Sequence, residues 1–262
     1  SGEVIGGSVA GINTDFRGND GKTTINLNQG ADISAASGIA IRSTHSDATV
    51  NLNNGAKVSG QILLGNGNNT LNLNQGSDVS GLTVINGNDD DDPEDSITTL
   101  NINQSLTGSS FSEGAAGDVA ILNWNIINVG NAAQTRNATL TLSGDLNADQ
   151  ITIASGGRVN VSSAVRDVTL AGKVNNAGSL DLGIERNSDN RLTIEGDYSG
   201  DNGNLVLNSV LEGDNGTADR LIVNGDTAGH TWVSINNLGG QGALTDKGIE
   251  IVTVKGDSAG TF

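Results

Sequence analysis

A short phrase of alternating apolar and polar residues returns several times along the first part of the chain. Its copies cover residues 23–34, 49–60 and 70–81, and a degraded copy covers residues 99–108. In the first copy Ile25 and Leu27 are apolar, and Thr24, Asn26 and Asn28 beside them are polar. This period of two predicts a β-strand with one buried face. The glycine after each strand predicts a corner, because glycine adopts positive φ without a steric cost.

The spacing of the copies predicts the architecture. The equivalent positions Leu27, Leu52, Leu73 and Ile102 are separated by 25, 21 and 29 residues. A period of roughly 20–50 residues is typical of stacked repeats. Each copy reads as strand and corner only, so we predict an all-β fold in which one repeat forms one coil of a β-solenoid. At roughly 20–25 residues per coil, the 262 residues would form about ten to twelve coils.

Further short apolar or alternating segments extend the prediction to the rest of the chain. They are residues 38–41, 61–64, 82–85, 119–122, 139–142, 151–153, 159–161, 168–170, 180–182 and 192–194. Two stretches interrupt the pattern, near residues 86–98 and 106–118, and we expect loops there. The first stretch holds six carboxylates and the only proline of the chain. Such a cluster cannot be buried without partners, so this loop should leave the solenoid.

Composition and charge exclude several classes of partner. The net charge is −17, whereas nucleic acids and anionic membrane surfaces are bound by basic surfaces. No run of apolar residues is long enough for a helical membrane span, so we expect no membrane insertion of this segment. The chain has no cysteine, which excludes disulfides, thiol catalysis and cysteine-ligated metals. Aromatic residues make up 2% of the chain, too few for stacking on bases.

Catalytic motifs are not evident. Nucleophilic catalysis needs a serine or cysteine with a base beside it, and neither His45 nor His230 lies in such a sequence context. We therefore expect a protein that is not an enzyme. The alternative is a polysaccharide-cleaving enzyme, because solenoids of parallel strands support such sites where carboxylates converge.

Two acidic or asparagine-rich stretches are candidates for calcium. The acidic residues of the first loop are candidate binding residues for a cation or a basic partner: Asp89, Asp90, Asp91, Asp92, Glu94 and Asp95. Calcium prefers several oxygen ligands, but the spacing of an EF-hand is missing here. Residues 65–73 resemble a calcium-binding nonapeptide, although Asn69 occupies the position of the liganding aspartate. We expect a solvated acidic loop, no metal site and no cofactor, with calcium at the loop as the alternative.

Stacking of the repeats in register would place like residues above one another. One ladder would contain Asn26, Asn51, Asn72 and Asn101, and a second would contain Asn28, Asn53, Asn74 and Asn103. A third would alternate in charge through Asp32, Lys57 and Asp78. Stacked amides can hydrogen-bond along the stack, so one interpretation is that the ladders only stabilise the solenoid. The other is a flat polar surface that binds another copy or a polysaccharide.

The last part of the chain carries a series of motifs. They are Tyr-x-Gly from Tyr198, Gly-x-Leu-x-Leu from Gly203, Asp-Arg-Leu-x-Val-x-Gly-Asp from Asp219, Gly-Ala…Thr…Gly-Ile-x-x-Val from Gly242 and Gly-Asp-Ser-x-Gly-x-Phe from Gly256. Residues 191–262 thereby resemble the C-terminal part of autotransporter passenger domains, the pertactin-like and diffuse-adherence-type adhesins. The earlier coils resemble this family only in the style of their repeats.

The resemblance implies a right-handed parallel β-helix that is secreted through the outer membrane by a C-terminal barrel. It implies β-helix coils over residues 1–190 and a C-terminal cap, often called an autochaperone, over residues 191–262. The cap would fold first and template the coils that precede it in sequence. Its expected folding core contains Tyr198, Leu221, Val223, Trp232, Ile249 and Phe262. We expect the side chain of Trp232 to pack on the terminal coil.

Architecture, the lack of catalytic motifs and the resemblance together favour one function. We expect a surface adhesin or a self-association factor in aggregation and biofilm formation, acting through the ladders and loops. The expected partner is another copy on a neighbouring cell, or a host extracellular-matrix protein or glycan. The expected location is the cell surface of a Gram-negative bacterium, reached through the periplasm, with release from the surface as an option.

Overall fold

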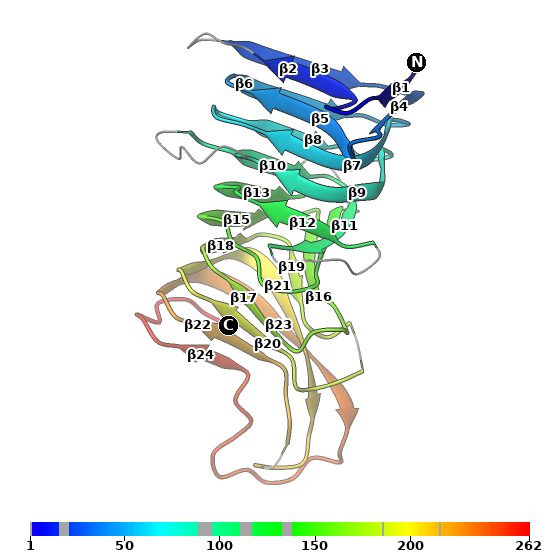
Figure 1. The fold of residues 1–262 in the computed structure, drawn as a ribbon. Helices are drawn as coiled ribbons and strands as arrows, with labels where there is room; N and C mark the ends of the chain where they lie inside the picture. The colour runs from blue at the N-terminus through cyan, green and yellow to red at the C-terminus, as the bar shows by residue number, and fades with distance from the viewer. Residues whose placement is uncertain are drawn as a thin grey trace. The chain divides into compact units, whose positions relative to one another are not determined.

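The fold is described from a computed structural model that covers residues 2–15, 21–88, 96–110, 117–132, 138–184, 186–214 and 216–262. In these residues the chain is nearly all β and has no helix, and its parallel strands form a β-solenoid of about nine turns (Figure 1). The predicted fold class is therefore confirmed. The turns are fewer than the ten to twelve expected because several coils are long. Equivalent residues lie 29 positions apart between Thr70 and Thr99, and between Tyr198 and Thr227.

The chain divides into two compact units, residues 1–128 and 129–262. The strands of the first unit are β1 (Gly2–Gly6), β2 (Ile12–Asp15), β3 (Lys22–Leu27), β4 (Ala31–Ala35), β5 (Ile39–Thr44), β6 (Asp47–Leu52), β7 (Lys57–Leu64), β8 (Thr70–Leu73), β9 (Asp78–Asn86), β10 (Thr99–Ile102), β11 (Ser105–Ser109) and β12 (Val119–Leu122). The boundary between the units lies in β13 (Ile126–Val129). Parallel pairing joins each strand to its equivalent in the next coil, so that β3, β6, β8 and β10 follow one another.

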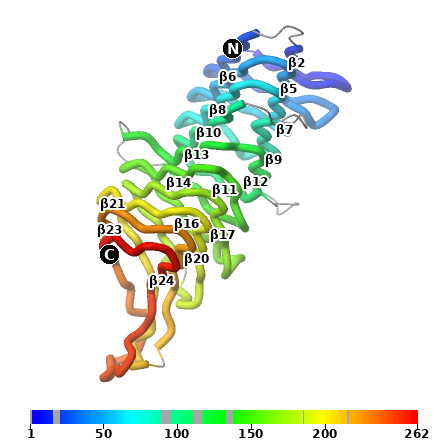
Figure 2. The backbone as a smooth tube through the Cα atoms, turned by 90° about the vertical axis from the view of Figure 1, so that its left-hand side faces the viewer, coloured from blue at the N-terminus to red at the C-terminus, as the bar shows by residue number. Residues whose placement is uncertain are grey.

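The second unit repeats this plan with longer strands at its C-terminal end. Its strands are β14 (Ala138–Leu142), β15 (Gln150–Ile153), β16 (Gly157–Val161), β17 (Asp167–Leu170), β18 (Lys173–Asn176), β19 (Ser179–Asp181), β20 (Arg191–Ile194), β21 (Tyr198–Val210), β22 (Arg220–Val223), β23 (Thr227–Gly239) and β24 (Val252–Val254). Strands β17, β20, β22 and β24 form a sheet of their own, and β21 pairs with β23 over most of its length. The coils of each unit can be followed in the backbone trace (Figure 2).

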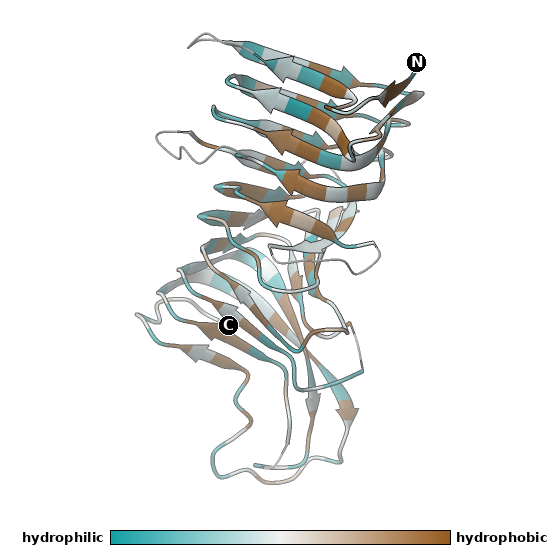
Figure 3. Ribbon diagram, in the orientation of Figure 1, coloured by the Kyte–Doolittle hydropathy of each residue, from teal (hydrophilic) through white to brown (hydrophobic). Residues whose placement is uncertain are grey.

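The core of the first unit is a stack of aliphatic side chains from equivalent strands. The register places Ile25 beside Val50 and Leu27 beside Leu52, and Leu71 and Leu100 continue the first column. None of these side chains is more than 9% exposed. Apolar residues alternate with polar ones along the strands, as the colours of Figure 3 show. The predicted alternation is therefore confirmed, and burial of apolar area along the whole stack stabilises it.

The predicted glycine corners are also confirmed. Gly30, Gly55 and Gly76 adopt positive φ values of 82°, 76° and 83°. The corners stack on one another, because the N–H of Gly30 donates to the carbonyl of Gly55 and that of Gly55 donates to Gly76. A Cβ on Gly55 would lie 2.9 Å from the Cγ of Gln29. Glycine is thus required here both by the backbone conformation and by the close approach of the neighbouring coil.

The second predicted loop, near residues 106–118, is partly wrong. Residues 105–109 form β11, which pairs in parallel with β12. The reason is burial: Leu106 is only 4% exposed, and a Cβ on Gly108 would lie 2.2 Å from the carbonyl oxygen of Val119. Serine and glycine are typical of loops, but their small side chains also fit where strands approach closely, as they do here. Of the first predicted loop, residues 89–95 lie outside the described residues.

The structure gives Asn69, in the nonapeptide-like segment, a structural role. Its side chain is completely buried. Its amide nitrogen donates to the carbonyls of Gly65 and Gly87, and its oxygen accepts the N–H of Ala48 at 2.9 Å. Both amide N–H groups are therefore used, and the side chain links three neighbouring segments of backbone. This geometry favours a polar cross-link over a calcium ligand.

Replacement of Asn69 should destabilise the first unit. Asn69→Ala would leave one buried N–H and two buried carbonyls without their partner, and each such group costs about 1–3 kcal/mol. We expect the free energy of unfolding to fall by at least about 2 kcal/mol in denaturant titrations. The exposed Asn54 provides the matched control, and Asn54→Ala should change stability little. Equal losses in the two variants would contradict this role for Asn69.

Candidate binding face and folding core

The first asparagine ladder forms as the register predicts. Asn26, Asn51, Asn72 and Asn101 occupy equivalent positions on β3, β6, β8 and β10. The side-chain nitrogens of Asn51, Asn72 and Asn101 each donate to the side-chain oxygen of the ladder asparagine in the preceding coil, at 2.7 Å. Asn128 on β13 extends the ladder with a 2.8 Å hydrogen bond to Asn101. Asn128 was not predicted from the sequence, because the repeated phrase is reduced there to Ile-Ile-Asn-Val.

The second asparagine ladder runs along the corner that follows these strands. The side chain of Asn53 donates to Asn28 at 2.9 Å, Asn74 donates to Asn53 at 2.9 Å, and Asn103 donates to Asn74 at 3.2 Å. Burial increases along this ladder, from the exposed Asn28 to Asn103, which is 9% exposed. The second ladder therefore serves mainly to hold the corners in register.

A column of threonines lies beside the first ladder. Thr24, Thr49, Thr70 and Thr99 are in register with one another, and each precedes a ladder asparagine by two residues. Side chains two residues apart point to the same side of a strand. We call the eight residues the Thr–Asn face: Thr24, Thr49, Thr70, Thr99, Asn26, Asn51, Asn72 and Asn101. Like groups repeat about every 4.8 Å across the strands, and the two columns lie about 6.7 Å apart.

The chemistry of this face is that of a fixed array of hydrogen-bonding groups. A primary amide has two N–H donors and an oxygen with two lone pairs. Within the ladder an amide uses one N–H and one lone pair, so one donor and one acceptor remain for a ligand. The hydrogen bonds along the ladder fix the amide orientations before any partner arrives, which lowers the entropic cost of binding. The face contains no charged residue.

The charged ladder forms as well, but its geometry favours mutual neutralisation. Lys57 lies in register between Asp32 and Asp78, and its Nζ is 3.7 Å from Asp32 Oδ2. Hydrogen bonds from the hydroxyl and the backbone N–H of Ser80 lower the pKa of Asp78, and the nearby Lys57 charge adds to the effect. Because the Lys57 and Asp32 side chains are nearly half exposed, the pair contributes little stability.

The remaining candidates for metal or catalytic chemistry receive no support. Asp89 to Asp92, Glu94 and Asp95 lie outside the described residues. Elsewhere in the described chain, no three His, Cys, Asp or Glu side chains are grouped closely enough to hold a metal ion. His45 contacts Asp15, and His230 contacts the hydroxyl of Thr261, so neither contact pairs a histidine with a serine. No helix in the described part is long and apolar enough to cross a membrane.

Tyr198, a residue of the predicted C-terminal folding core, is buried and contacts its neighbouring coils. Its side chain is 1% exposed, and its ring stacks on Phe262 with 5.8 Å between the centroids. Its hydroxyl is 2.9 Å from the hydroxyl of Thr231 and accepts a hydrogen bond from Asn176 at 3.1 Å. These contacts join three successive coils, because β18 pairs with β21 and β21 pairs with β23. Leu221 and Val223 of the predicted core are also fully buried.

The prediction for Trp232 is wrong. Its side chain is 59% exposed, and it packs edge to face with His230 instead of on the terminal coil. Alternation along β23 explains the error, because Thr231 points inward to Tyr198 and Trp232 must then point outward. Phe262 is 39% exposed despite its stacking on Tyr198, and Ile249 is half-buried. Of the six predicted residues, three are therefore buried, namely Tyr198, Leu221 and Val223.

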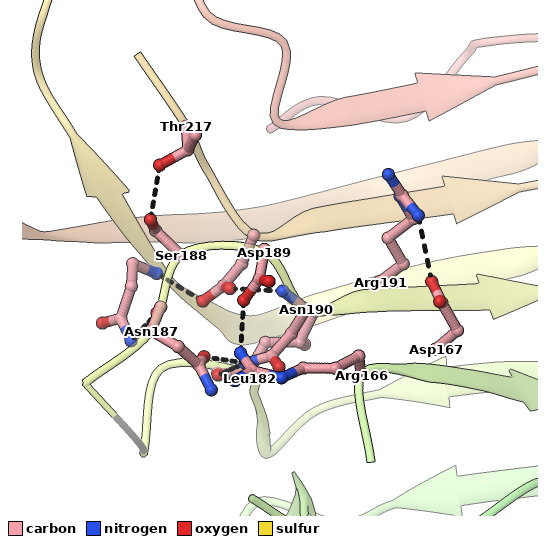
Figure 4. Close-up of polar contacts among 11 residues, drawn as sticks. Arg166, Asp167, Leu182, Asn187, Ser188, Asp189, Asn190, Arg191 and Thr217 are labelled. Atoms are coloured by element: carbon pink, nitrogen blue, oxygen red, sulfur yellow. Dashed lines mark hydrogen bonds and ion pairs between the residues drawn. The ribbon is translucent and has the colours of Figure 1, made fainter.

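A buried carboxylate, Asp219, connects three segments of the second unit. It opens the Asp-Arg-Leu motif and is completely buried. One carboxylate oxygen accepts the N–H of Asn190 at 2.9 Å, and the other accepts the N–H of Asn208 at 2.7 Å. Asn190 in turn donates through its side chain to Leu182 and Asn187 (Figure 4). The aspartate thereby fixes the loop before β20 against the C-terminal end of β21.

The environment of Asp219 raises its pKa to about 6. Removal from water is the main cause, because burial disfavours the charged form. The two backbone N–H donors oppose this effect, and the charges of Asp189 and Asp181 add to it. Around the same loop, Arg166 pairs with Asp189, and a separate pair joins Arg191 to Asp167 (Figure 4).

Comparison with known proteins gives one family match, at the C-terminal end, and several relatives. Residues 163–262 match the family model described as Autochaperone Domain Type 1. The chain is 49% identical over 73 residues to the Uncharacterized protein YdeU of Escherichia coli (strain K12), covering 28% of this chain and 16% of that protein. It is 33% identical over 169 residues to the Adhesin BmaC autotransporter of Brucella suis biovar 1 (strain 1330), covering 64% of this chain and 5% of that protein.

A third relative is the Autotransporter adhesin AIDA-I of Escherichia coli, which is 42% identical over 74 residues, 28% of this chain and 6% of that protein. These similarities support an autotransporter passenger domain. They also support export to the cell surface of Gram-negative bacteria. The chain spans no more than 16% of the length of each of the three relatives.

The autochaperone match begins at residue 163, before the boundary at residue 191 that the motifs indicate. The match therefore includes β17 to β20 and the loop held by Asp219. It also includes a ladder at the corners of the coils that the motifs did not predict. The carboxylate of Asp197 accepts the N–H of Asp226 at 3.1 Å, and that of Asp226 accepts the N–H of Asp257 at 2.8 Å.

The sequence signal of this corner ladder is a Gly-Asp pair, which recurs at residues 196–197, 225–226 and 256–257. The glycine is needed because a Cβ at Gly225 would lie 2.6 Å from the Oδ1 of Asp197, and one at Gly256 would lie 2.4 Å from the Oδ1 of Asp226. Each carboxylate therefore occupies the space above the glycine of the next coil. Successive aspartates of this ladder are 29 and 31 residues apart, which equals the length of the local coils.

The buried Asp219 should make the stability of this chain pH-dependent. Its folded pKa of about 6 lies above the ordinary value of 3.8, so the folded state binds more protons than the unfolded chain between these values. The stability that Asp219 contributes is therefore fully present below about pH 4, and it is lost as the pH rises through about 6. Denaturant titrations of the Asp219→Asn variant should lack this component of the pH dependence.

The exposed Asp201 supplies the control, and the Asp201→Asn variant should keep the pH dependence of the parent protein. NMR titration of the Asp219 carboxyl carbon should give a midpoint near the stated pKa. A midpoint at or below the ordinary aspartate value would show that the two backbone donors outweigh burial, and the prediction would then be wrong.

Proposed function

We propose that this chain belongs to the passenger of a surface adhesin, that the Thr–Asn face makes its adhesive contact, and that residues 163–262 fold first. Two of the relatives are named adhesins, and similarity to them supports the general role. Their names also favour a non-enzymatic role over the polysaccharide-cleaving alternative. The partner that fits the face is a second copy on a neighbouring cell, or a host extracellular-matrix protein or glycan.

The single observation that carries the adhesive role is the locked ladder of the Thr–Asn face. An extended partner can repeat the same hydrogen bonds from one coil to the next, so many weak contacts add along the stack. The face is also neutral in a chain whose net charge is −17. Like-charged molecules repel one another, and contact between two neutral faces keeps the repelling groups apart. Self-association through this face is therefore the form of adhesion that the charge distribution favours.

The adhesive role can be tested by placing charge on the face. Bacteria that display the full passenger should settle in aggregates, and the double variant Thr49→Glu, Thr70→Glu should lose most of this settling. The introduced carboxylates would face like charges on the partner and would be desolvated on contact. Higher salt should preserve or strengthen the aggregation of the parent, because salt screens the repulsion between the acidic molecules.

The matched control is the double variant Gln75→Glu, Thr83→Glu, which adds the same charge at exposed positions outside the face. It should settle like the parent at equal surface display. Mixtures of displaying and non-displaying cells separate self-association from receptor binding, because only self-association restricts aggregates to displaying cells. Undiminished settling of the variant with glutamates on the face would exclude the face as the contact.

The folding role of residues 163–262 is supported by the family match and by packing. A solenoid interacts only between neighbouring coils, so folding can begin at one end and propagate. Large side chains bury more apolar area each, and Tyr198 joins three coils at this end. The buried Asp219 and the corner carboxylates add further links within the same stretch. We therefore infer that this end is the most stable part and serves as the template.

Partial unfolding followed by limited proteolysis tests the folding role. The parent should yield a resistant fragment that begins between about residues 163 and 190. Tyr198→Ala should abolish this fragment, because truncation of a buried aromatic residue costs about 3–5 kcal/mol. Trp232→Ala should retain it, since the Trp232 side chain is exposed. A resistant N-terminal fragment, or equal effects of the two substitutions, would contradict the assignment of Tyr198 as the centre of the folding core.

A further inference from the structure

Trp232 stands on the outer side of the coil, and its large apolar ring is 59% exposed. It lies within β23, which pairs with β21 over an unusually long stretch, so its backbone is held firmly. The edge-to-face contact with His230, at 4.6 Å between the ring centroids, fixes the orientation of the indole. The imidazole is itself held by a 2.8 Å hydrogen bond between Nδ1 and the hydroxyl of Thr261. The ring is thus presented in a defined position without a covering element among the described residues.

Polar groups surround this ring. The register places Asn204 of β21 directly beside Trp232, and Asp201 of the same strand beside His230. The side chains of Asn204 and Asp201 are exposed. Ser234 follows on the outer side of β23, and Ser179 of β19 lies next to Asn204. One aromatic ring is therefore bordered by an amide, a carboxylate, an imidazole and hydroxyl groups.

We propose that Trp232 and its neighbours Asp201, Asn204 and His230 form a binding site for a single neutral saccharide ring. A pyranose has an apolar face of C–H groups, which packs on an aromatic ring, and a rim of hydroxyl groups, which needs hydrogen-bonding partners. The indole supplies the first requirement and the surrounding side chains supply the second. The site lies in the second unit and is independent of the Thr–Asn face.

The composition of the border argues against an apolar protein partner. The apolar residues nearest in sequence, Val233 and Ile235, lie on the inner side of β23, so they do not extend the indole into a contiguous apolar patch. The outer side of the strand offers only the indole as a large apolar group. The exposed carboxylate of Asp201 disfavours acidic sugars, which is the reason for assigning a neutral one.

The test uses the intact chain, labelled with ¹⁵N, because its two tryptophans serve as reporter and internal control. The probes are methyl β-D-glucoside, methyl β-D-galactoside, N-acetylglucosamine and maltotriose. At least one should shift the indole N–H signal of Trp232 saturably, with a Kd in the millimolar range typical of a single-ring contact. The signal of Trp124 should stay in place, because that ring is 3% exposed and its N–H donates to the carbonyl of Ile85.

Three variants decide whether the site is the one proposed. Trp232→Ala should abolish saturation with an unchanged melting temperature, Trp232→Phe should keep weaker binding, and Asn204→Ala should raise the Kd by about threefold or more. Saturable binding that persists in Trp232→Ala would overturn the proposal. So would shifts that stay linear with concentration for all four probes, because they would show that no specific site exists.

Discussion

In-register stacking of one coil on the next is the constraint on which the rest of this protein depends. A parallel strand pair with zero shift between equivalent residues brings Ile25 to Val50 inside and Asn26 to Asn51 outside. The same register that closes the apolar core therefore also builds the surface. A slip by one residue would exchange the two faces of the strand, exposing the aliphatic column and burying the amides. Burial of the core thus specifies the polar array as a consequence.

The two ends of the described chain satisfy this constraint with different chemistry. In the first unit, amide side chains bridge the coils, and Asn69 carries a polar link into the interior. In the second unit, carboxylates take over: Asp197 and Asp226 receive backbone N–H groups at the corners, and Asp219 receives two in the interior. Hydrogen bonds to charged acceptors are stronger than those between neutral groups, which applies to the corner carboxylates. At Asp219 burial works against the charged form and raises the pKa, so this link is the pH-dependent one.

Two surfaces of the described residues carry the functional proposals. The Thr–Asn face offers a repeated array, suited to an extended partner that is bound by many equal contacts. Trp232 offers the opposite, a single aromatic platform with a mixed polar border. An adhesin that uses both would combine a long, weak contact with a local, more specific one. The two surfaces belong to different units, so each can be altered without disturbing the other.

The sequence by itself determined the parts that depend on local periodicity. Alternation at Ile25 and Leu27 gave strands, the recurring glycines gave corners, and the equal phrases gave the register of the asparagine ladders, because in each case neighbouring residues carry the signal. The family resemblance marked the C-terminal motifs as important without stating what Asp219 or the Gly-Asp pairs do. Only the tertiary structure showed that Asp219 is buried, because its partners, Asn190 and Asn208, are distant in sequence.

The tertiary structure also decided which aromatic residue belongs to the core. Tyr198 and Trp232 both lie in strands with suitable alternation, and composition cannot tell which side of the strand faces inward. The hydroxyl pair between Tyr198 and Thr231 fixes that choice and turns Trp232 outward. Likewise, β11 could not be predicted, because the serines and glycine at residues 105–109 are strand residues only where a neighbouring coil approaches closely. Local pattern sets the element, and contact with the next coil sets which of its sides is the inner one.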